Sequence, residues 1–214
     1  MNKLIEISRI TDILKSGMRV MIGGYTNCGV PNKIIKHIAQ SGIKELCVIT
    51  SDCHIKGKGI GLLIKNDCIN RLIVSHVGLN TQAGEFIKAG KIKAELVPMG
   101  TFAERIRAAG AGIGGFLTKT GVGTQVQNGK QVLNLDGVDY LLEKPIFADV
   151  ALVKASKIDL FGNMSYHGTT ATYNTIMTMA ANTVIAQADE IVEHLDPNEI
   201  SASGIFVDYI VKND

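Results

Sequence analysis

The sequence predicts an α/β fold in which helices flank a mostly parallel central sheet. Short apolar runs alternate along the chain with segments in which apolar residues recur three or four positions apart, a pattern typical of parallel strands joined by helices. The composition agrees, because a chain that is 46% hydrophobic, 5% aromatic and contains 23 glycines suits buried strands joined by tight loops. No repeat, charged run or linker rich in proline and serine divides residues 1–214, so we expect one domain.

The predicted strands follow one another as short apolar runs. In chain order they cover residues 18–22, 46–50, 72–75, 95–97, 132–135, 140–142, 150–153, 184–186 and 206–211. Helical spacing is found around Ile13, Ile38 and Ile87, and again over residues 101–109. The stretch 129–142 breaks this alternation: two apolar runs flank Asp136-Gly137, a favoured turn pair, which predicts a small β-hairpin excursion.

Charge and hydropathy exclude several classes of partner. The 22 basic and 20 acidic residues leave a net charge of +2, and the lysines and arginines form no stripe, so we expect no nucleic-acid partner. Lys3, Glu6 and Arg9 interrupt the first apolar stretch, and no run is long enough to span a bilayer. We therefore expect a cytoplasmic protein that contacts no membrane.

Four cysteines are present, and none belongs to a CxxC pair. A metal cluster of Cys47, Cys53 and His54 is one interpretation. The alternative is a buried thiol, which the position of Cys47 inside the apolar run 46–49 favours. We expect reduced thiols and no metal site.

The first of two glycine-rich loops follows the strand predicted at residues 18–22. Gly23, Gly24 and Gly29 allow a tight turn, and Pro31 opens a helical segment. Backbone N–H groups placed before a helix suit an anionic or carbonyl oxygen, which predicts a ligand-binding loop. The alternative is a plain tight turn between strand and helix.

The second glycine-rich loop, residues 110–124, contains GxGxxG at Gly110, Gly112 and Gly115. A dinucleotide-binding fingerprint must follow a strand and open a helix, whereas this one follows a helical pattern and precedes turn-rich residues. Close backbone packing would explain some of the glycines. Since ordering so many glycines is entropically costly, we expect a loop that faces a ligand or a partner.

The chain resembles the alpha subunits of family I coenzyme A transferases, including those that act on acetate, acetoacetate and butyrate. The first loop is similar to the family's Gly-Gly-Phe-x-x-x-Gly-x-Pro signature, with Tyr25 in place of Phe and Ser16 where the signature opens with Asp or Asn. Matching segments follow in the family's order at residues 75–78, 95–101, 104–107, 110–124, 148–155, 159, 162–163 and 204–211. The resemblance implies a CoA-transferase-like fold over the whole chain.

The resemblance also implies a chemistry in which CoA moves between a short-chain acyl-CoA and a free carboxylate through a glutamyl-CoA intermediate. The nucleophile lies in a Glu-Asn-Gly type motif of the family's beta subunit, and no glutamate here is followed by Asn or Gly. We therefore expect no catalytic residue in this chain, a beta-subunit partner, and coenzyme A as a substrate without a permanently bound cofactor. Glu104 is expected to make a structural contact with an arginine on its helix.

Two groups of site residues follow from the resemblance. The residues expected to contact CoA are Gly23, Gly24, Tyr25, Thr26, Asn27, Cys28 and Gly29. Those expected at the acyl pocket or at an interface are Met99, Gly100, Gly114, Gly115 and Phe116. Met99 stands where the family usually has glutamine, either as a neutral change or as a change in acyl preference.

Two other functions remain open from the sequence: an enzyme similar to a sugar-phosphate isomerase, and a non-catalytic acyl-CoA-binding protein. The isomerase would need its own acid/base pair, and the sequence does not locate one. A Ser75–His76 dyad is not expected, because adjacent residues on a strand point to opposite faces.

Overall fold

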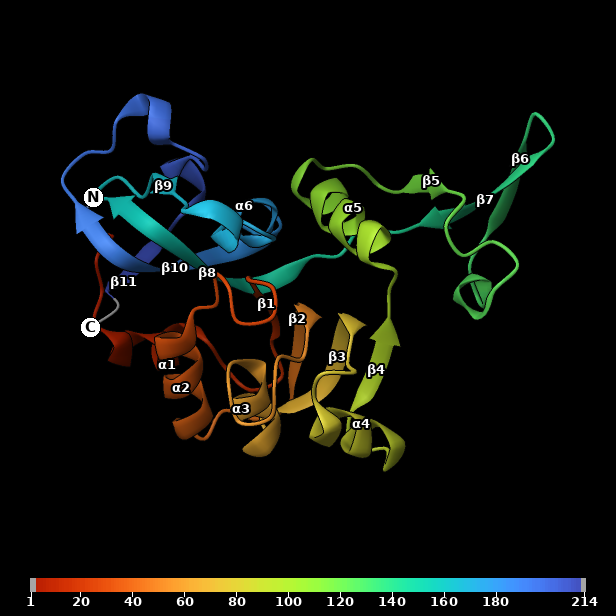
Figure 1. Cartoon of the computed structure of the whole chain (residues 1–214), viewed down its shortest axis with the longest axis horizontal. Helices are drawn as coiled ribbons and strands as arrows, with labels where there is room; N and C mark the ends of the chain where they lie inside the picture. The colour runs from red at the N-terminus through yellow and green to blue at the C-terminus, as the bar shows by residue number, and fades with distance from the viewer. Residues whose placement is uncertain (1–2, 213–214) are drawn as a thin grey trace.

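The computed structural model describes residues 3–212 and contains an eight-stranded sheet, mostly parallel as predicted. Seven strands form the order β11-β10-β8-β1-β2-β3-β4 with parallel pairing, and β9 pairs antiparallel with β8 (Figure 1). The strands are β1 (Arg19–Ile22), β2 (Leu46–Asp52), β3 (Ile69–His76), β4 (Lys93–Leu96), β8 (Ala148–Asp159), β9 (Met164–Ser165), β10 (Ala181–Val192) and β11 (Tyr209–Lys212).

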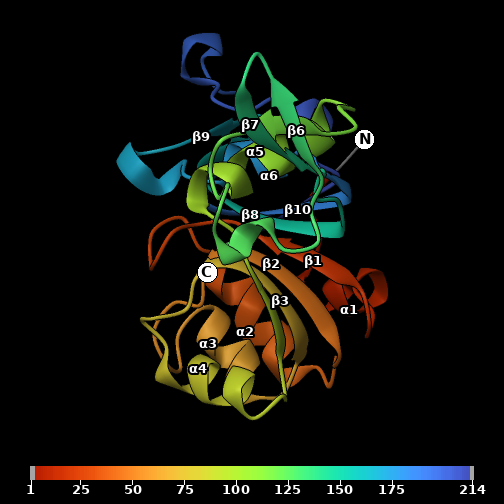
Figure 2. The ribbon, with the colours of Figure 1, turned by 90° about the vertical axis from the view of Figure 1, so that its right-hand side faces the viewer.

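Helices cover both faces of the sheet (Figures 1 and 2). The first face packs against α1 (Ile10–Ile13), α2 (Asn32–Gln40), α3 (Ile60–Lys65) and α4 (Thr81–Lys88), and the second against α5 (Met99–Gly110) and α6 (Asn174–Met177). Single 3₁₀ turns lie at Ile7–Arg9, Gln125–Gln127, Gly168–Thr170, Pro197–Glu199 and Gly204–Phe206. The α/β fold predicted from the sequence is confirmed.

The central strands are apolar along their length because both of their faces are buried. Within β1, Val20 and Ile22 belong to the core beneath α1–α4, while Met21 belongs to the core beneath α5 and α6. Met21 is in register with Ile49 on β2 and Ala151 on β8. Burial on two faces removes the polar alternation of a half-exposed strand, which explains the continuous apolar runs in the sequence.

A second sheet forms an arm that projects from the body of the molecule (Figure 1). It contains β5 (Phe116–Thr118), β6 (Val132–Leu135) and β7 (Val138–Glu143), paired antiparallel in the order β5-β7-β6. Asp136 and Gly137 turn between β6 and β7 with φ angles of 51° and 77°, which fits the left-handed pair that tight hairpins prefer. The predicted hairpin is confirmed, and β5 is an addition that the sequence did not indicate.

Several strand boundaries differ from the sequence predictions. Both β8 and β10 are 12 residues long, because their apolar centres continue into half-buried segments that contain polar residues. The last strand starts at Tyr209 rather than at residue 206, since Gly204–Phe206 forms a 3₁₀ turn. Hydrophobic patterns in a sequence locate the ends of strands and helices less reliably than their centres.

Candidate functional site

Two loops meet at the carboxyl edge of the parallel sheet, because β1 and β2 are neighbours that point the same way. Residues 23–29 follow β1, and residues 53–59 follow β2. Asp52, which is 1% exposed, joins them: its carboxylate accepts hydrogen bonds from the Thr26 N–H at 2.8 Å and the His54 N–H at 2.7 Å. The Ser51 hydroxyl lies 3.0 Å from the same carboxylate and 3.0 Å from the Gly24 carbonyl.

The loop at residues 23–29 is a tight turn that requires its glycines. Tyr25 and Cys28 exchange backbone hydrogen bonds of 3.0 and 2.9 Å. Gly24 and Gly29 have φ angles of +101° and +66°, in the left-handed region that other residues rarely adopt. A Cβ on Gly23 would overlap the Asn174 amide oxygen. These positions leave no room for a larger side chain.

Asn174, at the start of α6, holds the other side of the same loop. Its amide nitrogen donates to the Gly29 carbonyl and to the Thr170 carbonyl, both at 2.9 Å, and its amide oxygen accepts from the Lys154 N–H at 3.0 Å. The side chain is fully buried. The loop is therefore fixed from two directions, by a buried carboxylate and by a buried amide.

The fixed loop leaves backbone donors unused. Within residues 3–212, the N–H groups of Gly24, Asn27 and Gly29 have no protein acceptor. Asn27 and Cys28 are exposed, and Tyr25 is 41% exposed. Gly24 and Gly29 are themselves buried, so Asn27 carries the unused donor that lies on the exposed part of the loop. An immobile donor there suits a carbonyl or anionic oxygen of a ligand, because it needs no reorganisation when the ligand binds.

His54 supports the second loop. Its Nδ1 accepts from the Ile60 N–H at 3.1 Å, and the side chain packs so closely that a Cβ on Gly59 would overlap it. Burial lowers the pKa of His54, against the opposing effect of the Asp52 charge, so the imidazole is neutral. Its Nε2 has no hydrogen-bond partner among the described residues. His54 therefore shapes this loop from inside.

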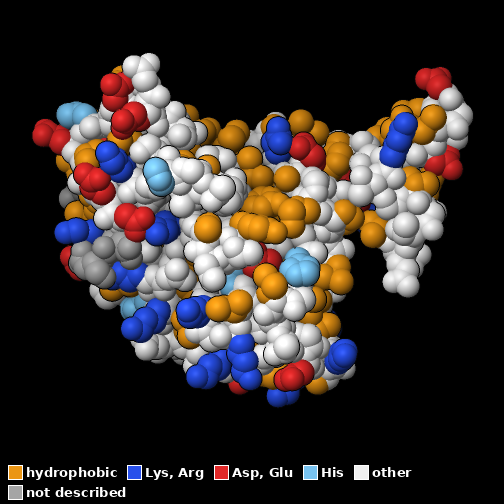
Figure 3. Space-filling model, in the orientation of Figure 1, with side chains coloured by type: hydrophobic (Ala, Val, Ile, Leu, Met, Phe, Trp, Pro, Cys, Tyr) orange, Lys and Arg blue, Asp and Glu red, His pale blue; other side chains and the backbone are white. Residues whose placement is uncertain are grey.

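An aromatic contact links this edge of the sheet to α5. The rings of Phe102 and Tyr173 meet edge to face, with centroids 5.5 Å apart. Burial raises the pKa of Tyr173, and the neighbouring Tyr25 and Asp52 act in the same direction. Met99 begins α5 and is 41% exposed. Hydrophobic side chains gather at the centre of this face, beside the arm (Figure 3).

The structure separates the predicted acyl-pocket group into two places. Met99 and Gly100 form the first turn of α5, whereas Gly114, Gly115 and Phe116 lie beyond its last residue, at the base of the arm. A Cβ on Gly115 would lie 2.9 Å from the Glu143 carbonyl. The GxGxxG run follows a helix and precedes a strand, the reverse of a dinucleotide-binding context, as the sequence predicted.

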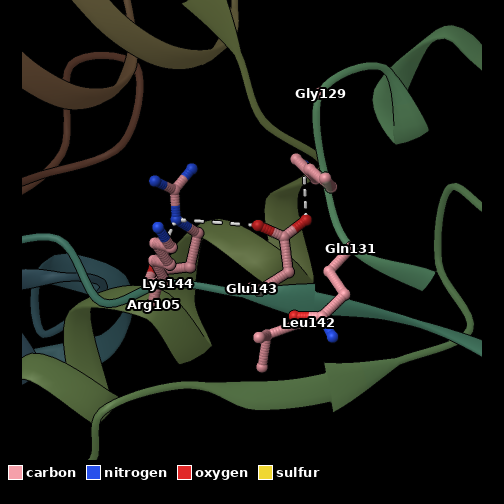
Figure 4. Close-up of a pocket in the computed structure, with 7 residues that line it drawn as sticks. Arg105, Gly129, Gln131, Leu142, Glu143 and Lys144 are labelled. Atoms are coloured by element: carbon pink, nitrogen blue, oxygen red, sulfur yellow. Dashed lines mark hydrogen bonds and ion pairs between the residues drawn. The ribbon is translucent and has the colours of Figure 1, made fainter. Parts of the chain in front are cut away.

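A hollow of about 320 Å³ lies at the base of the arm (Figure 4). Glu143, whose side chain is 2% exposed, lies between Lys130 and Arg105. Arg105 donates to Glu95 and to the Lys144 carbonyl, each at 2.7 Å. Burial acts to raise the pKa of Glu95, but the hydrogen bond and charge of Arg105 outweigh it and lower the pKa. These charges pair with one another, so the hollow is a structural junction.

Other residues singled out in the sequence have structural roles. Glu104 makes the expected Glu–Arg contact on its helix, with Arg107 at 2.8 Å rather than with the adjacent Arg105, which pairs with Glu95 and Glu143. Cys47 and Cys53 are buried, as expected, and burial raises the pKa of Cys53 to about 12. The Ser75 hydroxyl makes no hydrogen bond within residues 3–212, in agreement with the absence of a Ser75–His76 dyad.

Two kinds of feature are missing from the part of the chain that the structure describes. Residues 3–212 contain no group of three His, Cys, Asp or Glu side chains arranged to hold a metal ion. None of the helices in that range combines the length and the apolar character that a membrane crossing requires.

The sequence interpretation missed Asp52, Tyr173 and Asn174. Asp52 had a usable signal, because Thr50-Ser51-Asp52 adds polar residues to the end of an apolar run at the same sheet edge as the first loop. Asn174 had none, since it lies 145 positions from the Gly29 carbonyl that it binds.

Comparisons with known proteins give a consistent result. The family model described as Coenzyme A transferase matches residues 6–213. The acetoacetyl-CoA:acetate/butyrate CoA transferase alpha subunit of Clostridium acetobutylicum is 43% identical over 213 residues, which are 99% of this chain and 98% of that protein. The acetate CoA-transferase subunit alpha of Escherichia coli is 39% identical over 211 residues, 98% of this chain and 96% of that protein.

Solved structures share the fold at lower identity. An Escherichia coli acyl-CoA transferase, in a thioester complex with CoA, has a TM-score of 0.88 at 18% identity; the match covers 99% of this chain and 47% of that one, so this chain spans about half of its length. Glutaconate coenzyme A-transferase from Acidaminococcus fermentans has a TM-score of 0.84 at 18% identity, over 98% of this chain and 75% of that one. None of these findings supports the isomerase-like alternative or the purely binding alternative.

Proposed function

The chain belongs to the coenzyme A transferase family, and we propose that it is the alpha half of a hetero-oligomeric enzyme that exchanges CoA between a short-chain acyl-CoA and a free carboxylate. Its relatives are named for acetoacetyl-CoA, acetate and butyrate, which are the substrates we propose for this chain. No resident cofactor is needed, because CoA itself is a substrate. A cytoplasmic location is part of the same proposal.

The observation that carries the proposal is the rigid loop at residues 23–29. Asp52 and Asn174 fix it from two sides while the N–H groups of Gly24, Asn27 and Gly29 remain without protein acceptors in the described chain. Transfer of an acyl group passes through tetrahedral intermediates whose oxyanion must be stabilised by donors already in place. In our proposal this loop binds the CoA thioester end and supplies such donors.

The nucleophile is proposed to come from a beta subunit. The carboxylate that touches the loop, Asp52, is buried and already accepts three hydrogen bonds, so it is poorly placed to attack a thioester. Glu95 and Glu143 are held in ion pairs at the base of the arm. Glu104 is paired with Arg107 on the surface of α5. These observations support a partner that brings its own glutamate.

The exposed apolar side chains around α5 support the same proposal. Leu96, Met99 and Ile113 flank the two ends of α5 and are 59%, 41% and 50% exposed. Large apolar side chains exposed at both ends of one helix are consistent with a surface that a partner covers. We propose that the beta subunit covers this part of the molecule and completes the active site.

Acyl exchange between acetoacetyl-CoA or butyryl-CoA and acetate tests the proposed function. The chain is purified alone and together with a beta subunit, and exchange is followed by the appearance of acetyl-CoA. We expect activity in the complex and none in the chain alone. Activity of the chain alone would place the nucleophile here, and a stable but inactive complex would contradict the proposed substrates.

Met99 is proposed to line the acyl pocket and to disfavour acyl groups that carry a β-keto oxygen. Methionine offers a flexible apolar surface and no amide donor. In the active complex, Met99→Gln should therefore raise kcat/KM for acetoacetyl-CoA relative to butyryl-CoA. Met179→Gln is a matched control, because Met179 is equally exposed at 41%. An unchanged ratio in Met99→Gln would remove Met99 from the acyl pocket.

A further inference from the structure

A groove of about 360 Å³ opens beside the loop at residues 23–29. One wall comes from that loop and from α2, with Asn27, Asn32 and Lys36, and the other from the segment that leads into α3, with Gly57, Lys58 and Gly59. Helices α2 and α3, which pack against each other (Figure 1), contribute Lys36 and Leu62 to its lining. Asn27 belongs both to the groove and to the proposed CoA loop, so the two are continuous.

The groove is electropositive. Lys36 and Lys58 are exposed on opposite walls, and none of the side chains lining the groove is acidic. Neither lysine has an ion pair with an acidic side chain among residues 3–212. Two lysines that line one groove without a counter-charge attract an anion. An anion bound between them would form charge-assisted hydrogen bonds with both and relieve their mutual repulsion.

Backbone donors line the same groove. The N–H groups of Asn27, Gly57 and Gly59 have no protein acceptor within the described residues. Gly57 and Gly59 have φ angles of +76° and +49°, so this segment turns through left-handed conformations; Gly57 is half-buried and Gly59 is buried. The Lys58 N–H between them donates to the Ile55 carbonyl, which leaves the Gly57 and Gly59 N–H groups as the donors that this turn offers to phosphate oxygens.

The wall that carries Lys58 is held in place before any ligand binds. His54 accepts the Ile60 N–H and packs against Gly59, and the His54 N–H is held by Asp52. Asp52 also holds the Thr26 N–H on the opposite wall. One buried carboxylate therefore sets the spacing between the two walls of the groove.

We propose that this groove binds the phosphate groups at the nucleotide end of CoA. The proposal rests on the proposed function and adds to it a site on this chain for the end of CoA that does not react. CoA carries a diphosphate and a ribose phosphate, whose charges match the two lysines and whose oxygens match the N–H groups. The pantetheine arm then runs past Asn27 to the donors of the 23–29 loop.

The test uses the complex with the beta subunit and the variants Lys36→Gln, Lys58→Gln and the double variant. Each single variant should raise the KM for acyl-CoA by about 3- to 10-fold, the double variant by more, with kcat and the KM for the carboxylate unchanged. The Kd for CoA, measured by calorimetry, should rise by the same factors, and the effect should shrink with added salt. Lys58→Arg should retain most of the affinity.

Lys65→Gln is the matched control, because Lys65 is exposed at the end of α3 outside the groove and its loss changes the net charge equally. An acyl-pantetheine thioester, which has no nucleotide, should be used equally well by wild type and variants. With 3′-dephospho-CoA, an effect of the lysine variants that disappears assigns the ribose phosphate to the groove, and one that persists assigns the diphosphate.

The groove proposal would be overturned if the double variant raised the Kd for CoA no more than Lys65→Gln does. This outcome is separate from failure of the proposed function. An inactive wild-type complex that still binds CoA, with weaker binding in the lysine variants, would reject the transferase substrates and keep the groove.

Discussion

The two glycine-rich loops look alike in the sequence and differ in the structure. In the loop at residues 23–29, side chains at Gly23, Gly24 or Gly29 would meet Asn174, Val30 or backbone carbonyls. In the loop at residues 110–124 the glycines divide into two kinds. A Cβ added at Gly112, Gly114 or Gly123 would meet nothing within 4 Å, whereas one at Gly110, Gly115 or Gly121 would lie within 3 Å of Met179, the Glu143 carbonyl or Val126. Close packing therefore accounts for every glycine of the first loop but for only half of those in the second, where the others give the chain conformational freedom.

The two loops are also held by different forces. Buried hydrogen bonds from Asp52 and Asn174 fix the first loop. Ion pairs among Glu95, Arg105 and Glu143 hold the base of the arm next to the second loop, and Glu95 is 35% exposed there. Water and salt weaken the Glu95–Arg105 pair more than the buried hydrogen bonds of the first loop, whereas the pair of Arg105 with Glu143, which is 2% exposed, is largely shielded. The comparison predicts a first loop that tolerates little change and a second that tolerates more.

The largest effect is expected for Gly29→Ala. The new Cβ would overlap the Thr170 carbonyl, and alanine disfavours the φ of +66° found there. Overpacking and backbone strain together should lower the free energy of unfolding by about 2 to 4 kcal/mol. Urea denaturation measures this, and Gly114→Ala is the control, because its Cβ would meet nothing within 4 Å. Equal losses in both variants would remove the proposed difference between the loops.

Asp52→Asn should have the next largest effect. An asparagine keeps the shape but presents N–H donors toward the N–H groups of Thr26 and His54, which now donate to the carboxylate. We expect a loss of about 1 to 3 kcal/mol in the free energy of unfolding. The KM for acyl-CoA should rise as well, because the loop loses its anchor. Asp12→Asn controls for the loss of a negative charge, because Asp12 forms an ion pair on the surface and is 56% exposed. If Asp52→Asn were as stable as wild type, Asp52 would not anchor the loop.

Gly115→Ala tests the part of the second loop that is packed. Its Cβ would lie 2.9 Å from the Glu143 carbonyl, and its φ is outside the left-handed region. The arm can shift slightly to relieve this contact, so the expected loss is about 1 kcal/mol, near the lower limit for overpacking. Thermal denaturation should place this variant between Gly114→Ala and Gly29→Ala. A loss as large as that of Gly29→Ala would show that the second loop is equally constrained.

The smallest effect is expected for Glu95→Gln, and it depends on pH. Because the pKa of Glu95 is lowered from its usual 4.5 in the folded protein, its stabilising contribution is complete above that value and is lost as pH falls through the folded pKa. Wild type should therefore be more stable than Glu95→Gln near neutral pH, and the two should converge below pH 4.5. Denaturation across this range measures the difference. Glu104→Gln, which removes an exposed ion pair, is the control, and a difference that does not depend on pH would contradict the assignment.

Local patterns predicted the architecture well, for a physical reason. Strands buried on both faces must be apolar along their length, and Asp136-Gly137 suits a turn that few other pairs adopt, so both features are written in short stretches of sequence. The ends of β8 were missed because lysine, serine and aspartate residues interrupt its apolar pattern, and those of β10 because they are half-buried or exposed, where polar residues are tolerated.

The sequence by itself determined the α/β fold, the position of both glycine-rich loops, the hairpin and the resemblance to the family. Only the tertiary structure decided which glycines are required by packing, that Asp52 joins the loops after β1 and β2, and that Lys36 and Lys58 line one groove. The first set depends on residues close together in the chain, whose spacing is visible as a pattern. The second depends on contacts such as Asn174 to Gly29, 145 positions apart, which exist only once the sheet has placed the ends of its strands side by side.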